Sequence, residues 1–428
     1  MTGARVPKTV ITGIVACVVV LSLTLLIPIP QSRGLSGPSE LLSPDGFAFQ
    51  ADPSNLTLKS PHAQSDGEFG YSVSSTATRS VVGAPDENVS GHYEAGQAYI
   101  YNATTGTLIY TLKSPNPQSH GYFGYSVAIS SAIVVVGGLQ YNSSGVFQAG
   151  CAYVFNVTTG KLVHTLKSPN AMSDGWFGYS VAIGGAMIAV GAPGETVAED
   201  EGAGHAYIFN ETTGKRAHTL TSSNAQSGGS FGWSVAVSDT TVVVGALYET
   251  ASGFSEAGHA YIFNATTGKH VRTLTSPNAQ SNGYFGSRVA ISGAAALVSA
   301  PFETALGYAG AGHAYVFSST TGNLILTLTS PNAQDPGYFG WGIAISASRL
   351  AVGAPFEAAK GYSYAGHTYV FNATTGLLVE TLTSPHAQAG GRFGNSVAIV
   401  STAVIAGACD ETASGYTYAG HAYVIMST

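Results

Sequence analysis

The segment WFGYSVAIGGAMIAVGAP, Trp176–Pro193, decides the fold, because close copies of it recur along the chain. Each copy contains a Phe-Gly pair, and successive pairs are 54 residues apart without an insertion. A fixed period of this length is typical of a repeat architecture. Seven such units account for residues 51–428 of the 428-residue chain. The pairs begin at Phe69, Phe123, Phe177, Phe231, Phe285, Phe339 and Phe393.

Each unit predicts four antiparallel strands. In FGYSVAIG, residues 177–184, apolar residues alternate with small ones, as in a strand with two unequal faces. AMIAVGAP, residues 186–193, is almost continuously apolar, which is typical of a strand covered on both faces. GHAYIFN (204–210) and KRAHTLTS (215–222) flank the turn ETTG. A four-stranded sheet cannot bury two apolar faces alone, and blades stacked around an axis bury both.

The two ends of the repeat region predict a closed ring. NLTLKSP, residues 55–61, has the phase of a fourth strand, whereas the last unit stops after its third strand. Pairing of Asn55–Ser60 with His421–Met426 would complete the last blade and leave no exposed edge. We therefore predict an all-β fold, a seven-bladed β-propeller of 54-residue four-stranded repeats, closed by pairing of the first strand with the last blade.

Composition supports this class and excludes one partner. The chain is 45% hydrophobic and 9% charged, and its 54 glycines and 23 tyrosines suit short strands joined by tight turns. A net charge of −7 without a basic run gives no electrostatic footprint for nucleic acid. Of three cysteines, Cys17 lies near the N-terminus, and Cys151 and Cys409 stand in units that are not neighbours. We expect no disulfide framework.

The N-terminal segment predicts export. Arg5 and Lys8 precede an apolar run over residues 10–29 that is long enough to span a bilayer. We interpret residues 1–30 as a signal peptide or an N-terminal membrane anchor, and the length and positive flank of the run favour the anchor. Lipid attachment at Cys17 is disfavoured, because the apolar run continues beyond it. Residues 31–50 form a Ser/Pro/Gly-rich linker, and residues 51–428 form the propeller, which we expect to be secreted or at the cell surface.

Potential N-glycosylation sites agree with this location. Five of the eight recur at one phase of the repeat, where Asn and Gly are also ordinary turn residues, so both interpretations stay open. The candidates are Asn55, Asn88, Asn102, Asn142, Asn156, Asn210, Asn264 and Asn372.

The spacing of Phe177-Gly178 and Gly191-Ala192-Pro193 resembles the FG-GAP repeats of the integrin α-subunit β-propeller. All seven units carry the Phe-Gly pair, and the second element is intact in three and degenerate in four. The resemblance covers residues 51–428 and implies a seven-bladed propeller of an extracellular recognition protein.

One departure from the family concerns calcium. Integrin-type repeats often carry a D-x-D-x-D-G calcium loop between the first two strands, where several oxygen ligands converge. Here the corresponding turns read ISSAI, IGGAM, VSDTT or ISGAA, and Asp239 alone cannot make a site. We therefore predict no cofactor and no metal, although the resemblance leaves calcium possible, and the closer likeness is to prokaryotic repeats that lack the loop.

The loop after each second strand is the candidate binding site. A carboxylate recurs there in six units, and an aromatic residue follows in most of them. Carboxylates accept hydrogen bonds from hydroxyls, and flat rings cover the apolar face of a sugar. The alternative is that both residue types only hold the repeat together. The candidates are Glu87, Tyr93, Glu195, Glu249, Phe254, Glu303, Tyr308, Glu357, Tyr362, Glu411 and Tyr416, with Phe147 as a further aromatic.

Four other patterns are weaker. Histidines recur at the start of the third strand, where rotation from blade to blade would spread them rather than gather them around a metal. The acidic run Glu199–Glu201 is typical of a solvated surface. GYSVA fits a nucleophile elbow only superficially, because its serine lies within a strand. The ATTGK hairpin resembles that of quinoprotein propellers, but their docking tryptophan is missing, so a quinone cofactor is a minor alternative. The histidines are His205, His259, His313, His367 and His421.

The leading functional prediction is a non-catalytic binding or adhesion module that recognises a protein or glycan partner through loops on one propeller face. Because each unit repeats the same residues, no clustered acid, base, nucleophile or metal ligand is evident. An extracellular hydrolase or quinoprotein-like enzyme with an axial site is the second hypothesis, and unit-specific polar residues on the axis would favour it. A passive structural surface protein is the third.

Overall fold

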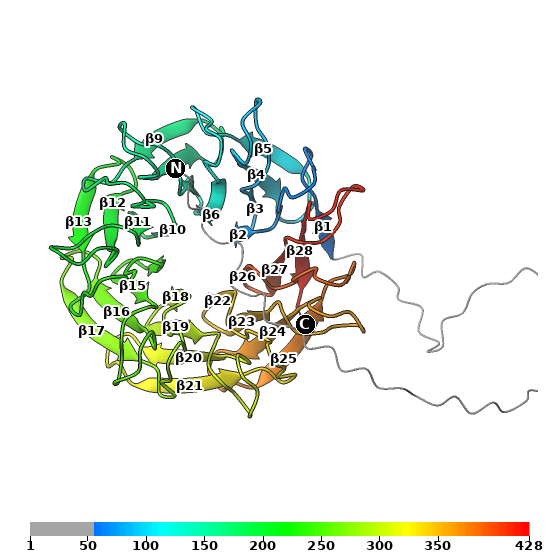
Figure 1. The fold of residues 1–428 in the computed structure, drawn as a ribbon. Helices are drawn as coiled ribbons and strands as arrows, with labels where there is room; N and C mark the ends of the chain where they lie inside the picture. The colour runs from blue at the N-terminus through cyan, green and yellow to red at the C-terminus, as the bar shows by residue number, and fades with distance from the viewer. Residues whose placement is uncertain (1–54, 428) are drawn as a thin grey trace, which may run out of the picture. The chain divides into compact units, whose positions relative to one another are not determined.

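The computed structural model describes residues 55–427, which form a ring of seven four-stranded antiparallel sheets (Figure 1). This confirms the predicted β-propeller. In each sheet the first strand of the unit lies nearest the axis and the fourth lies at the outer rim (Figure 1). The predicted N-terminal segment, residues 1–30, and linker, residues 31–50, lie outside the described residues. Within residues 55–427, no helix has the length and hydrophobicity of a membrane span.

The strands follow the repeat closely. Blade 1 contains β2 (Ser72–Ser75), β3 (Arg79–Ala84), β4 (Gln97–Asn102) and β5 (Leu108–Leu112). Blade 2 contains β6 (Phe123–Ile129), β7 (Ile133–Gly138), β8 (Cys151–Asn156) and β9 (Leu162–Leu166). Blade 3 contains β10 (Ser180–Gly184), β11 (Met187–Ala192), β12 (His205–Asn210) and β13 (Arg216–Leu220). Blade 4 contains β14 (Ser234–Val237), β15 (Thr241–Ala246), β16 (His259–Asn264) and β17 (His270–Thr275).

The last three blades have the same pattern. Blade 5 contains β18 (Val289–Ser292), β19 (Ala295–Ala300), β20 (His313–Ser318) and β21 (Leu324–Thr329). Blade 6 contains β22 (Ile343–Ile345), β23 (Arg349–Ala354), β24 (His367–Asn372) and β25 (Leu378–Thr383). Blade 7 contains β26 (Val397–Val400), β27 (Ala403–Ala408) and β28 (His421–Met426), and β1 (Leu56–Leu58) completes it.

The ring closes as the sequence predicts. β1 pairs antiparallel with β28, and Leu56 lies opposite Val424 while Leu58 lies opposite Ala422. Leu58 and Phe69 share a buried cluster with Val424. The strand that begins the ring therefore covers the outer edge of the blade that ends it, so the blade 7 sheet has no unpaired third strand.

The core lies between adjacent sheets. Phe177, at the entrance of blade 3, is fully buried and packs 5.6 Å from Tyr207 and 5.9 Å from Phe209, measured between ring centroids. The same cluster includes Val135 and Val154 of blade 2. Each Phe-Gly phenylalanine thus joins its own blade to the preceding one, which is why the residue recurs in every unit.

Two glycines let neighbouring blades approach at backbone distance. A Cβ on Gly178, whose φ is +92°, would lie 2.4 Å from the carbonyl oxygen of Cys151 in blade 2. A Cβ on Gly191 would lie 1.9 Å from the carbonyl oxygen of Gly232 in blade 4. Neither position has room for a side chain. The Phe-Gly and Gly-Ala-Pro elements are therefore the two halves of the blade-to-blade contact.

The GYSVA serine belongs to the same contact. Ser180 Oγ donates a hydrogen bond of 2.8 Å to the carbonyl oxygen of Gly232 in the next blade. The equivalent serines lie in or just before the innermost strands and make the same bond, so they hold adjacent blades together. They are Ser72, Ser126, Ser234 and Ser396.

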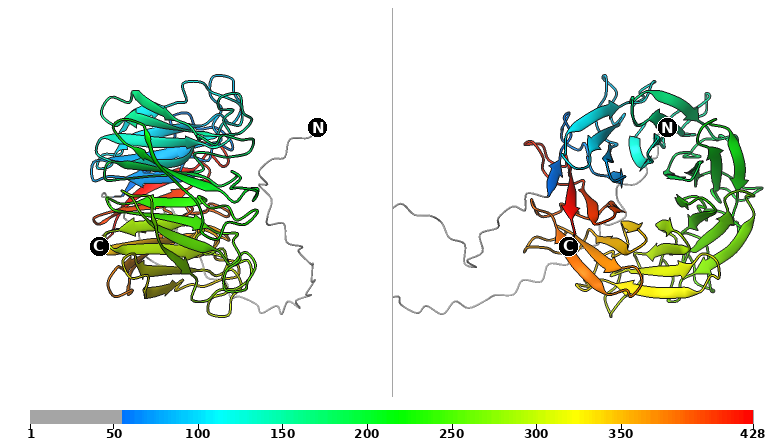
Figure 2. Two further views of the ribbon diagram at one scale, coloured as in Figure 1. Left: turned by 90° about the vertical axis from the view of Figure 1, so that its left-hand side faces the viewer. Right: turned by 180° about the vertical axis from the view of Figure 1, so that it is seen from behind.

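One face of the ring gathers two kinds of loop. Because consecutive strands run antiparallel, the loop after each second strand and the loop after each fourth strand emerge on the same side. Backbone hydrogen bonds join them, such as those from His120 N to Tyr93 O at 2.7 Å and from Asn282 N to Ser255 O at 3.0 Å. We call this the long-loop face; Figure 2 shows the ring edge-on and from behind. The turns at residues 102–107 and their equivalents lie on the opposite face.

Candidate ligand-binding face

The six recurring glutamates are inside the protein, which corrects the expectation that they are available to a ligand. Their exposed fraction is 0% in every case. In blade 6, Glu357 Oε2 accepts a hydrogen bond of 2.5 Å from Tyr369, and Oε1 accepts one from Ser330. His367 Nδ1 lies 2.9 Å from Oε2. A buried carboxylate requires such partners, and here they occupy the oxygens that a sugar hydroxyl would need. Five other glutamates are equally buried, and each accepts a hydrogen bond from the tyrosine twelve residues later, although Oε1 of Glu195 and of Glu249 has no such partner. These five are Glu87, Glu195, Glu249, Glu303 and Glu411.

The recurring histidines belong to these clusters. Each is the first residue of its third strand, and its Nδ1 lies 2.8–3.0 Å from the glutamate of the same blade. They are therefore distributed around the ring, one in each of blades 3 to 7. Within residues 55–427, no group of three or more His, Cys, Asp or Glu side chains is arranged to hold a metal ion.

Blade 1 differs because Gln97 replaces the histidine. Burial raises the pKa of Glu87 to about 7, although hydrogen bonds from Ser60 and Tyr99 oppose this. Since the folded-state pKa exceeds the unfolded one, the stability that Glu87 contributes is fully present below about pH 4.5 and is lost as pH rises through 7.

We expect the substitution Glu87→Gln to stabilise the protein more at pH 8 than at pH 4.5, by about 3 kcal/mol, because the neutral amide avoids the cost of a buried charge. Urea unfolding at the two pH values measures this difference. Glu357→Gln is the control for the loss of a buried carboxylate in a blade that keeps its histidine. An equal effect of Glu87→Gln at both pH values would contradict the assignment.

The loop aromatics, unlike the glutamates, are on the surface. Phe254 is 44% exposed and follows a tight turn at Ser252-Gly253, where both φ angles are positive. Ala251 and Phe254 exchange two backbone hydrogen bonds, of 3.1 and 2.9 Å, across this turn. Tyr308, Tyr362 and Tyr416 occupy the same position, and Tyr93 and Phe147 lie one residue later in their loops. Their exposed fractions are 47–54%.

A second set of aromatic residues, which the sequence analysis missed, lines the axis. Three tyrosines follow the Phe-Gly pairs of blades 1 to 3, and Trp233 follows that of blade 4. Ring centroids are 4.9 Å apart for Tyr71 and Tyr125, 5.1 Å for Tyr125 and Tyr179, and 4.5 Å for Tyr179 and Trp233. Burial raises the pKa of Tyr71 and Tyr179 well above the usual value, so their hydroxyls stay protonated donors. The sequence position that could have revealed these residues is the one directly after each Phe-Gly pair, because its residue type varies among the units while the pair itself does not.

The chain of rings continues over blades 4 to 6 on the long-loop face. Trp233 packs against Tyr248 at 5.5 Å, Tyr248 against Tyr284 at 5.3 Å, and Tyr284 against Phe302 at 4.8 Å. The series then continues through Tyr338, Trp341, Phe356 and Tyr364. We call the rings from Tyr71 to Tyr364 the aromatic arc. Aromatic–aromatic packing of this kind fixes ring orientation. Tyr179 and Tyr338 are buried within the arc, and its other rings are partly or fully exposed.

A hollow of about 230 Å³ opens on the axis between the first strands. Most blades contribute three layers of side chains to it: an aromatic residue after Phe-Gly, then a serine, then a valine or isoleucine. Blades 5 to 7 break this pattern with Arg288, Gly342 and Asn395. Polar residues specific to single units, Arg288 and Asn395, therefore do converge on the axis, which is the feature that would favour the hypothesis of an axial enzyme site.

The repeat region also matches a known family model. An FG-GAP repeat model matches four segments, residues 162–209, 215–263, 269–317 and 325–371. Each segment carries a Phe-Gly pair, and the first and last segments also carry an intact Gly-Ala-Pro element. The chain contains FG-GAP repeats. No curated protein matched the sequence in a similarity search.

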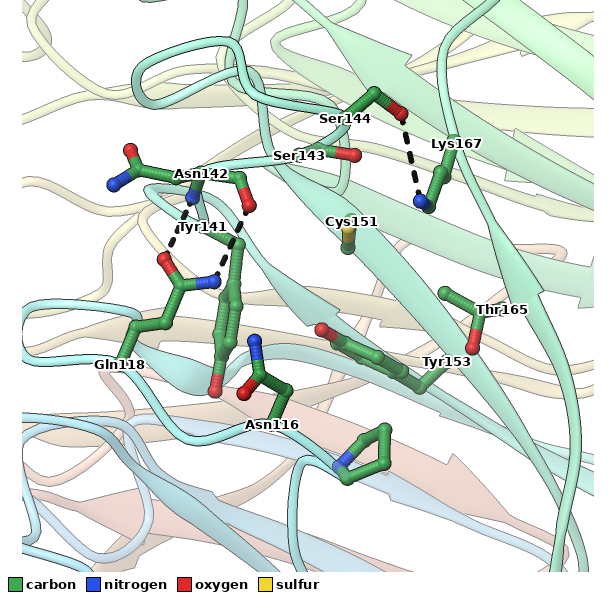
Figure 3. A pocket seen from close by; sticks show the side chains of 11 residues that line it. Asn116, Gln118, Tyr141, Asn142, Ser143, Ser144, Cys151, Tyr153, Thr165 and Lys167 are labelled. Carbon is green, nitrogen blue, oxygen red and sulfur yellow. Dashed lines mark hydrogen bonds between the residues drawn. The ribbon is translucent and has the colours of Figure 1, made fainter.

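The second FG-GAP repeat departs most from the others and contains another hollow, of about 260 Å³ (Figure 3). Tyr141 takes the place of the buried glutamate, and Cys151 takes the place of the histidine. A Cβ on Gly138 would lie 2.6 Å from the Tyr141 ring, so the alanine found there in the other repeats would not fit. The smaller Cys151 side chain leaves the space that an imidazole fills elsewhere. The hollow thus results from the replacements at residues 138, 141 and 151, which depend on one another through packing. Cys151 and Cys409 are buried and unpaired, as expected.

The sequons of the FG-GAP repeats have a structural use in the hairpins. Asn210 Oδ1 accepts hydrogen bonds from the backbone N–H groups of Thr212, at 3.1 Å, and Thr213, at 2.9 Å. Asn102, Asn156, Asn264 and Asn372 make the same bonds on the face opposite the long loops. Asn88 and Asn142 lie on the long-loop face, and Asn55 lies beside β1 and accepts a bond from Met426 N. Glycosylation of these residues stays a prediction.

The acidic run of the third FG-GAP repeat lies at the tip of its long loop. Val197 and Asp200 pair across the turn, and Asp200 Oδ1 accepts a hydrogen bond of 3.3 Å from Ser227. Glu199 and Glu201 are exposed. The run replaces the aromatic residue of the other long loops with carboxylates at the rim.

Proposed function

We propose that this FG-GAP protein is a non-catalytic binding module that recognises a protein or glycan partner through the long-loop face. Of the two kinds of partner, we favour a glycan. The observation that carries the proposal is the aromatic arc, in which rings from six blades follow one another from the axis onto that face. Flat rings provide large contact area at a low entropy cost. The exposed Phe254, Tyr308 and Tyr362 extend this surface outward.

The binding role is preferred to catalysis because of the residues at the axis. The side chains that line the axial hollow, within the described residues 55–427, are aromatic, aliphatic, hydroxyl or amide groups and one guanidinium. General acid–base chemistry most often uses histidine, a carboxylic acid or lysine, and also tyrosine; of these residue types the lining supplies only tyrosines. Tyrosine hydroxyls with raised pKa values act as hydrogen-bond donors in this setting.

A location outside the cell is part of the proposal. The apolar run over residues 10–29 supports export, as a cleaved signal peptide or as an anchor. An exported binding module would then meet glycans or proteins outside the cell.

A binding assay with matched surface variants tests the proposal. We expect the full-length protein to bind a glycan array or intact cell surfaces saturably, and the triple variant Phe254→Ala/Tyr308→Ala/Tyr362→Ala to bind about 100-fold more weakly, since each ring contributes about 1 kcal/mol. The control is Val163→Ala/Val271→Ala/Val379→Ala, which removes similarly exposed side chains from the outer strands β9, β17 and β25. No saturable binding, or equal losses in both triple variants, would refute the proposal.

A further inference from the structure

Arg288 is the one cation among the residues that line the axial hollow within the described part of the chain. Five other blades have serine at this position, and its hydroxyl bonds to the next blade. Blade 5 also has Ser299 in place of the strand glycine. A Cβ on the equivalent Gly245 of blade 4 would lie 2.5 Å from the Ser234 hydroxyl. This packing explains why residue 288 is not serine, but it does not explain why it is a cation.

The surroundings of Arg288 leave its charge without a partner carboxylate. Its Nη1 donates to the carbonyl oxygen of Ser287 at 3.0 Å, and no ion pair to it occurs among residues 55–427. A guanidinium has five N–H donors, so most remain for another acceptor. The neighbouring side chains are small: Ser287 stands where five other blades have an aromatic ring, and Gly342 follows in blade 6.

The hollow combines this cation with features suited to a sugar. Tyr179, across the axis, is close enough for the positive charge of Arg288 to oppose the burial that raises its pKa. Trp233 presents a ring surface, and Asn395 and the tyrosines offer polar groups. A volume of about 230 Å³ is below that of sites for drug-sized ligands, which hold about 300–1,000 Å³. It suits a single sugar ring.

We propose that the axial hollow binds an acidic sugar, a hexuronic acid, whose carboxylate is held by Arg288. Arginine suits this task because its planar fork matches a carboxylate with two parallel hydrogen bonds. The ring of the sugar lies against Trp233, and the hydroxyls of the sugar reach Asn395 and the tyrosines that line the hollow. This inference rests on the proposed function and specifies the ligand class of the same face.

Intrinsic fluorescence tests the inference directly. Of the three tryptophans in the chain, Trp233 lines the hollow and Trp341 directly precedes Gly342 of its lining. The full-length protein is titrated with D-glucuronate, with D-glucose, which differs at C6 only, and with acetate. We expect a saturable fluorescence change with glucuronate, at a Kd at least about tenfold lower than for glucose or acetate, since a charge-assisted bond contributes that much.

Two variants separate charge from packing. Arg288→Gln keeps much of the side-chain length and is expected to weaken glucuronate binding at least about tenfold while leaving glucose unchanged, and Arg288→Lys is expected to retain part of the preference. A urea midpoint equal to that of the unsubstituted protein shows that the fold is kept.

The other results overturn the inference. Equal affinity for glucuronate and glucose, or no effect of Arg288→Gln, would show that Arg288 does not hold the ligand carboxylate. Neither result would contradict the proposed function of the long-loop face. If acetate binds as tightly as glucuronate, the hollow recognises a carboxylate and not a sugar. If no probe binds, the axial ligand is wrong, and the Phe254/Tyr308/Tyr362 assay still decides whether the long-loop face binds a partner.

Discussion

Replacement of Glu357 by alanine is expected to lower the free energy of unfolding by about 4 kcal/mol, because three buried groups lose their common partner. Tyr369 and Ser330 donate hydrogen bonds to the two carboxylate oxygens, and His367 Nδ1 lies 2.9 Å from one of them. The carboxylate itself has no exposed surface, so water cannot replace it without opening the blade. Urea unfolding followed by circular dichroism measures the loss.

The control for this prediction lies in the same loop. Tyr362 is five residues away and 48% exposed, and Tyr362→Ala is expected to change stability by less than about 0.5 kcal/mol. Glu357→Gln preserves the shape and one acceptor, and we expect an intermediate loss. If Glu357→Ala costs less than about 1 kcal/mol, the glutamates are not the structural centres of the blades.

Gly191→Ala is expected to destabilise the protein by about 3 kcal/mol or more, because the added methyl group meets backbone rather than a flexible side chain. Its Cβ would lie 1.9 Å from the carbonyl oxygen of Gly232 and 2.4 Å from Ser180 Oγ. Relief requires blades 3 and 4 to move apart, which also weakens the bond from Ser180 to that carbonyl. The midpoint of urea unfolding is the readout.

The fifth repeat supplies the matched control. Ser299 stands at the position equivalent to Gly191, and the adjoining Gly340 is arranged differently, since a Cβ there would meet Ser299 Cβ at 2.8 Å. Ser299→Gly is therefore expected to cost no more than about 1 kcal/mol, the usual cost of glycine within a strand. A loss for Gly191→Ala no greater than that for Ser299→Gly would mean that the glycine contact does not limit the approach of blades.

The two residue types of one predicted site illustrate where sequence reasoning reaches its limit. Glu357 and Tyr362 recur with equal regularity in their loops, and the sequence offers no reason to separate them. In the structure, Glu357 turns inward to Ser330, which is 27 residues earlier, and to Tyr369, which is 12 residues later. The tight turn at Lys360-Gly361, with positive φ at both residues, presents Tyr362 to solvent. Burial depended on partners that are distant in the sequence.

The axial residues also show what the sequence of one repeat cannot reveal. Tyr71, Tyr125, Tyr179 and Trp233 are separated by 54 residues each, and only the stacking of blades brings neighbouring rings within 4.5–5.1 Å of one another. Arg288 is a single exception among similar units, and its significance depends on the side chains that face it from other blades. Neither feature is visible in a single repeat.

The sequence by itself determined the number of blades, the order of their strands and the closure of the ring, because these depend on a fixed period and on local alternation of apolar residues. Tertiary structure decided which loop residues are buried, which rings pack against one another and which side chains face Arg288. These properties depend on packing and on contacts across the axis, where residues from all seven units meet.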